Sequence, residues 1–167
     1  MKNLKIAVLA AAAFLLCSCG IYSFSGTSIQ PDIKSIEIST FEYKALKVNP
    51  SLSNDLSEAI RTRFRRMTSL EQVDHDADLE LQGEITGYEV SATAITAGEV
   101  AAKNRLTVNV KIEFTNNKYP EDNVSQSFSA YSEFDATNSL EAVQSTLCEE
   151  IIEKLVEDIF NATVAQW

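Results

Sequence analysis

The ten residues RLTVNVKIEF, at positions 105–114, alternate strictly between polar and apolar side chains. Successive side chains of a β-strand point to opposite faces of a sheet, so this alternation predicts a strand with one covered and one open face. The covered face would carry Leu106, Val108, Val110, Ile112 and Phe114. A sheet built around this strand needs a second layer on one side only.

The preceding segment, residues 79–92, shows the same one-sided alternation. Its first half has apolar side chains at Leu79, Leu81 and Ile85. The parity slips after Gly87, which predicts a β-bulge. Gly83 and Gly87 are both expected on the covered face, where another element can approach the backbone closely.

Two more strands are predicted around this pair. The turn TNNKYPEDN leads into VSQSFSAYSEF, residues 124–134, which is expected to return as a hairpin partner. Upstream, IKSIEISTFEYK (residues 33–44) is rich in strand-forming residues. Ile36 and Ile38 have one parity and Phe41 has the other, so a bulge or strand end is expected near Ser39.

Residues 49–67, NPSLSNDLSEAIRTRFRRM, predict an amphipathic helix, with Asn49 as N-cap and Pro50 at the first helical position. Its last turns hold four arginines: Arg61, Arg63, Arg65 and Arg66. These side chains are either solvated complements of the helix dipole or an anion site for phosphate or carboxylate groups.

Residues 139–163 predict a long closing helix, which Asn138 and Glu141 would begin as a capping box. Beside its main apolar stripe runs a second seam formed by Ile152, Val156 and Phe160. A wide apolar face indicates either deeper burial or contact with a partner protein. Cys148 lies within this face and is interpreted as a small core side chain.

The predicted order is strand, helix, three strands and helix. Because the strands need cover on one face only, we expect an α+β two-layer sandwich with two helices packed on one face of a four-stranded mixed sheet. Residues 33–167 would form this single domain.

The N-terminus is predicted to be a lipoprotein signal peptide, residues 1–18. Two lysines precede the apolar run from Ile6 to Leu16, which is too short to span a bilayer. Leu16 and Ser18 are spaced as in a lipobox before Cys19, which predicts lipidation of Cys19 and loss of Cys17 with the signal. Residues 19–32 would be the lipidated N-terminus and tether. The absence of an acidic residue directly after Cys19 favours the outer membrane.

The charge of the chain excludes one large class of partners. It has 14 basic and 24 acidic residues, and losing two lysines with the signal would leave 12 against 24, a net charge of −12. Nucleic acid is therefore not an expected partner. Membrane attachment is expected to rest on the acyl chains.

No catalytic residue, metal site or cofactor is predicted. The chain has one histidine, His75, in the sequence DHDAD, whose spacing matches no calcium-loop or zinc motif. No P-loop, G-x-S-x-G or G-x-G-x-x-G motif is present. A solvated acidic turn is the favoured interpretation, and an enzyme that uses His75 is the alternative.

Taken together, the lipobox and five segments resemble the lipopolysaccharide-assembly lipoprotein family (LptE-like). The segments are FEY, DLELQGEITGYEV, NRLTVNVKIEF, SFSAYSEF and EIIEKLVEDIFNATVAQW. They follow one another in this order, and the resemblance extends over essentially the whole mature chain. The resemblance implies a lipid-anchored protein on the periplasmic side of the outer membrane. It also implies a partner, the lipopolysaccharide translocon β-barrel, which such a protein plugs and helps to assemble, and binding of lipopolysaccharide itself.

The resemblance directs attention to two surfaces. A barrel lumen is polar, and the open face with Thr107, Asn109, Ser125, Ser127 and Ser129 suits it. Lipopolysaccharide carries phosphates, so the candidate lipopolysaccharide or anion contacts are Lys103, Arg105, Lys111, Arg61 and Arg65. The alternative function is a lipoprotein adaptor or pilot for another outer-membrane assembly or secretion machine.

Overall fold

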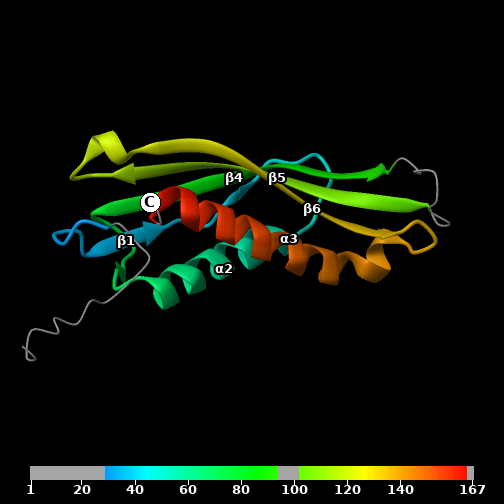
Figure 1. The fold of residues 1–167 in the computed structure, drawn as a ribbon, viewed down its shortest axis with the longest axis horizontal. Helices are drawn as coiled ribbons and strands as arrows, with labels where there is room; N and C mark the ends of the chain where they lie inside the picture. The colour runs from blue at the N-terminus through cyan, green and yellow to red at the C-terminus, as the bar shows by residue number, and fades with distance from the viewer. Residues whose placement is uncertain (1–28, 94–101, 165–167) are drawn as a thin grey trace, which may run out of the picture.

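The computed structural model describes residues 29–93 and 102–164, which form two long helices and one mixed sheet (Figure 1). In chain order the elements are β1 (Ser35–Ile38), β2 (Glu42–Tyr43), α2 (Leu52–Met67), β3 (Glu71–Gln72), β4 (Leu79–Ala92), β5 (Lys103–Asn116), the short 3₁₀ helix η1 (Pro120–Asp122), β6 (Val124–Asp135) and α3 (Leu140–Thr163). The described residues contain no helix that is long and apolar enough to cross a membrane.

The sheet has six strands, so the predicted number of four is wrong, whereas the α+β class, the two helices and the mixed sheet are confirmed. The order is β3-β1-β4-β5-β6, and β2 pairs with β4 beyond the end of β1. β1, β2 and β3 make parallel pairs, whereas β4, β5 and β6 are antiparallel.

The two additional strands have a local cause. Ile38 pairs with Leu81 and Glu42 pairs with Glu84, so the first segment uses four residues where β4 uses three. The extra residue divides the predicted strand into β1 and β2, which confirms the expected strand end near Ser39. β3 has two residues, too few to produce a recognisable alternation.

Both helices lie on one face of the sheet and run in the same direction (Figure 1). Near the start of α2, Asn49 Nδ2 donates to Cys148 Sγ at 3.4 Å, and near its end the rings of Phe64 and Phe160 meet edge to face at 5.2 Å. α3 packs against β6 and β5. Its contacts with β6 include the hydrogen bond that Ser132 Oγ donates to Glu150 Oε2 at 2.5 Å.

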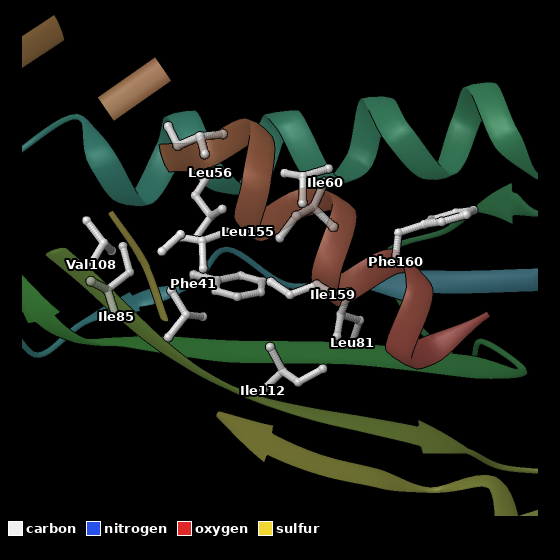
Figure 2. Close-up of a cluster of buried hydrophobic side chains, with 14 of the residues drawn as sticks. Phe41, Leu56, Ile60, Leu81, Ile85, Val108, Ile112, Leu155, Ile159 and Phe160 are labelled. Atoms are coloured by element: carbon white, nitrogen blue, oxygen red, sulfur yellow. The ribbon is translucent and has the colours of Figure 1, made fainter. Parts of the chain in front are cut away.

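One apolar core fills the space between the layers (Figure 2). The alternation of β5 is confirmed, because Leu106, Val108, Val110, Ile112 and Phe114 are all buried. Figure 2 shows Leu56 and Ile60 of α2 and Leu155 and Ile159 of α3 gathered with Leu81, Ile85 and Ile112 of the sheet, while the Phe160 ring points toward the end of α2. Full burial of one such side chain contributes about 1.5–3 kcal/mol.

The segment between β1 and β2 is fixed to both layers through Phe41. The Phe41 N–H donates to Ser57 Oγ at 3.0 Å, and the Phe41 carbonyl accepts a hydrogen bond from Ser53. Its ring lies against Gly83, where an added Cβ would be 2.4 Å from Phe41 Cε1. A glycine at position 83 is therefore what lets this aromatic ring lie directly on the strand.

The second glycine of β4 does not face the helices, contrary to the prediction. A register shift between Ile85 and Gly87 confirms the expected bulge. It turns Gly87 toward the open face, where an added Cβ would meet Asn109, and it places Tyr88 in the core.

Both helix starts differ from the predicted caps by one or two residues. α2 begins at Leu52, although Asn49 Oδ1 still accepts the Ser51 N–H at 3.3 Å. α3 begins at Leu140 after Ser139, without a side-chain cap from Asn138.

The Gly83→Ala substitution is predicted to lower the free energy of unfolding by about 1–3 kcal/mol, because its methyl group would overlap the Phe41 ring. Urea denaturation followed by circular dichroism measures this loss. Gly87→Ala is the matched control and is expected to lose less, since the amide end of Asn109 on the open face is able to turn away. An equal or greater loss in the control would contradict the proposed contact.

Candidate functional site

The open face of the sheet is a long polar surface formed by β4, β5 and β6. Register pairing aligns Thr107 with Tyr131 and Asn109 with Ser129, while Lys111 pairs with Ser127. The hydroxyl-bearing side chains Ser125, Ser127 and Ser129 are exposed, which confirms the predicted polar face.

One end of this face is organised around Arg105. An Arg105 guanidinium nitrogen (Nη2) lies 2.6 Å from Glu133 Oε1, and its central carbon lies 3.9 Å from the centre of the Tyr131 ring. The hydrogen bond from Arg105 lowers the pKa of Glu133, and the reciprocal bond raises the pKa of Arg105. The guanidinium is thus shared between a carboxylate and an aromatic ring that come from the same neighbouring strand.

A second set of paired charges lies where β2 meets β4. Lys44 Nζ contacts Glu84, and it lies 3.1 Å from Glu42 Oε2. The Lys44 hydrogen bond lowers the pKa of Glu84, and the same contact raises the pKa of Lys44. Sequence reasoning missed Lys44, because nothing in the local pattern shows that β2 lies beside β4.

The three predicted cations of β5 share the open face but do not form one cluster. Lys103 and Arg105 lie two residues apart at one end, whereas Lys111 lies about 20 Å further along the strand. Lys111 Nζ is 3.5 Å from Glu113 Oε1. The Lys103 carbonyl accepts hydrogen bonds from Thr93, whereas its exposed ammonium group has no hydrogen-bond or ion-pair partner among the residues that the structure describes.

The arginines of α2 are spread around the helix. Each helical residue turns about 100°, so Arg61 and Arg65 share one side while Arg63 lies on another. Arg61 donates to the Ile38 carbonyl from Nε at 3.1 Å and from Nη2 at 2.9 Å, and its Nη1 lies 2.6 Å from Glu58 Oε1. Arg65 is exposed, with one long contact of 3.5 Å to Gln72 Oε1. Arg61 therefore ties α2 to the end of β1.

The predicted seam of α3 divides between two environments. Phe160 lies in the core, where it contacts Phe64, and the Arg63 guanidinium carbon is 5.2 Å from the centre of its ring. Ile152 and Val156 lie at the floor of a groove between α2 and α3. The walls of this groove carry Arg63 and Arg66 from α2 and Glu149, Glu153 and Glu157 from α3.

The residues with side chains of the kind used in catalysis or metal binding, His75 and its acidic neighbours and Cys148, lie in two different environments. His75 is 86% exposed and lies 3.6 Å from Asp76, whose φ of 53° marks a left-handed turn residue. Among the described residues, no three His, Cys, Asp or Glu side chains are placed to hold one metal ion. Cys148 is buried, and desolvation raises the pKa of its thiol, which disfavours the reactive thiolate.

The Arg105–Glu133 pair predicts a contribution to acid stability. Folding lowers the pKa of Glu133, so this carboxylate stabilises the fold at pH values above its unfolded-state pKa. The contribution is lost as the pH falls through its folded-state pKa. The free energy of unfolding of the wild type should therefore fall between about pH 5 and pH 3 more steeply than that of Glu133→Gln. Urea titrations at a series of pH values measure the two slopes. Arg105→Gln should flatten the slope similarly, and an unchanged slope in both variants would contradict the pairing.

Comparisons with known proteins address the whole domain. The family model described as LptE, lipopolysaccharide-assembly, matches residues 33–163. No curated protein matches the chain. Among solved structures, the hypothetical protein CT253 from Chlamydia trachomatis is similar, with a TM-score of 0.52, 10% identity, and coverage of 80% of this chain and 99% of that one. A minor lipoprotein from Acinetobacter baumannii has a TM-score of 0.49 and 12% identity over 76% of this chain and 89% of its own.

The likeness to CT253 shows a shared fold. The family match extends from Ile33, just before β1, to Thr163, the last residue of α3, and therefore includes every helix and strand of the structure. The chain belongs to the LptE lipopolysaccharide-assembly family.

Proposed function

We propose that this protein is an outer-membrane lipoprotein that partners and plugs the lipopolysaccharide translocon β-barrel and assists lipopolysaccharide assembly at the outer membrane. The observation that carries the proposal is the family match over residues 33–163. The other features are consistent with a protein that acts through its surfaces.

The proposed anchor precedes the described residues. Residues 1–18 would be removed as a signal peptide, Cys19 would carry the acyl chains, and residues 19–32 would lead into the domain at 33–167. Ile29, Asp122 and Val164 line one small cavity, so the tether enters the domain at the end that carries η1 and the end of α3 (Figure 1). We infer that this end faces the membrane.

The open face suits a barrel lumen for a physical reason. Its Arg105 and Lys44 side chains are already paired with carboxylates of neighbouring strands, and the rows between them carry hydroxyl and amide groups. Such a surface is hydrated and offers few unpaired charges, which is appropriate for contact with a polar wall. Ile152 and Val156, in the groove between the helices, are a second candidate contact with the barrel.

Binding of lipopolysaccharide would have to be local, because acidic residues outnumber basic ones. Of the candidate contacts, Lys103 and Arg65 have the least committed side chains. Arg105 and Lys111 have carboxylate partners, and Arg61 is held at the Ile38 carbonyl. We therefore propose Lys103 and Arg65 as the strongest anion contacts of the set.

The protein is proposed to be a non-enzyme. His75 is 86% exposed on a turn, where it lies 3.6 Å from Asp76. The alternative function as an adaptor for another outer-membrane machine uses the same anchor and the same kind of surface, so the identity of the partner decides between the two.

Affinity purification of the acylated, full-length protein from its own membranes is predicted to recover the lipopolysaccharide translocon barrel in stoichiometric amount. Mass spectrometry of the complex identifies the partner. An unrelated outer-membrane lipoprotein with the same tag is the control. Recovery of a different assembly or secretion machine, without this barrel, would overturn the proposal in favour of the adaptor function.

Cys19→Ala is predicted to abolish membrane anchoring, whereas Cys17→Ala should leave it nearly unchanged, because only Cys19 follows a lipobox. Membrane fractionation and mass spectrometry of the N-terminus measure the acyl modification. Equal behaviour of the two variants would show that the proposed cleavage site is wrong.

A further inference from the structure

The sheet ends at β6, whose outer edge is unpaired along the described chain. Lys154 Nζ donates to the Tyr131 carbonyl at 2.9 Å, which shows that the peptide groups of Tyr131 point away from β5. In an antiparallel pair the outward peptide groups belong to every second residue. Ser125, Ser127, Ser129 and Glu133 therefore present N–H and C=O groups along the same edge.

This edge lacks most of the features that prevent strand pairing. The β6 sequence VSQSFSAYSEFD contains no proline, lysine or arginine, and its register with β5 is continuous from Val124 to Asp135, with no bulge. Isolated edges usually carry such features, because unpaired strands associate with other chains. Among the described residues, Lys154 of α3 reaches the edge and donates to the Tyr131 carbonyl, and Glu133 and Asp135 place charges at one end of the strand.

Two carboxylates and one ammonium group lie beside the edge, so its surroundings are acidic on balance. A hollow of about 320 Å³ is lined by Ser129, Ala130 and Tyr131 of β6 and by Lys154, Glu157 and Asp158 of α3. Glu157 and Asp158 thus lie beside the Ser129–Tyr131 part of the edge, where an added strand would pass. A second copy of this chain would bring two carboxylates and one lysine from the same hollow, on a chain with 24 acidic and 14 basic residues, and this excess of like charge opposes the pairing.

We propose that the outer edge of β6 is a strand-addition site for an extended, basic segment of a partner protein. The backbone of the segment would continue the sheet with hydrogen bonds to the outward groups of Ser125, Ser127 and Ser129. Its lysine or arginine side chains would lie beside Glu157 and Asp158. This inference concerns an edge of the sheet and does not depend on the proposed barrel function.

The test uses the full-length acylated protein in detergent and a seven-residue peptide in which lysine alternates with threonine. A second peptide is identical but N-methylated at alternate residues, so it keeps its charge and loses the N–H groups that strand pairing requires. Calorimetric titration is expected to show saturable binding of the first peptide and at least a tenfold weaker affinity for the second. Equal affinities would mean electrostatic adsorption and would overturn the proposal, as would no binding by either peptide.

Substitutions locate the site independently. The double variant Glu157→Gln with Asp158→Asn should weaken peptide binding by about three- to tenfold. The double variant Asp74→Asn with Asp76→Asn removes the same number of charges from the exposed turn around His75 and should not weaken it. Circular dichroism checks that each variant folds. The comparison of the two peptides uses the wild-type protein, so it does not depend on the folding of any variant. Concentration-dependent dimerisation that the peptide does not disrupt would assign the edge to a second copy and overturn the proposal.

Discussion

The structure depends on one constraint, the need to cover a single apolar face made by three long antiparallel strands. The inward side chains of β5, from Leu106 to Phe114, are all buried. α3 alone cannot cover the full width of the sheet, because its contacts are with β5 and β6. α2 must therefore be held over the β1 side. Phe41, with both peptide groups bonded to α2 serines and its ring on Gly83, provides that attachment.

The same constraint decides what the sequence predicts and what it does not. The strand alternation and the helix stripes are local, so β5, the bulge of β4 and both helices follow from them. The division of the first strand and the outward turn of Gly87 depend on single-residue register shifts, which reverse a face without changing the composition. The Arg61 contact with the Ile38 carbonyl joins residues 23 positions apart and has no local signature. The open polar face was predictable, whereas the pairing of its cations was not.

Pairing of the cations with carboxylates lowers the number of positive charges that the open face offers to a ligand. Arg105 and Lys44 look basic in the sequence, yet each is matched by a carboxylate from a neighbouring strand. Exposed pairs of this kind contribute little to stability, and their principal effect is to remove isolated charges from the face. A phosphate-bearing ligand would have to compete with Glu133 for Arg105. Recognition by exposed cations such as Lys103, at the beginning of β5, avoids that competition.

An open sheet also leaves the outer edge of its last strand unpaired, and along the described chain one such strand is β6. The helix layer covers the inner side of β6, and among the described residues Lys154 donates a hydrogen bond to a carbonyl on its outer edge. The exposed serine side chains of β6 leave its peptide groups open, and the carboxylates of Glu157 and Asp158 beside it would oppose another copy of the same acidic chain. In the proposed arrangement, charge rather than the occlusion of backbone groups limits pairing of this edge with a second copy. A surface protected in this way excludes like-charged strands and remains open to basic ones, so its means of avoiding self-association is also a basis for selecting a partner.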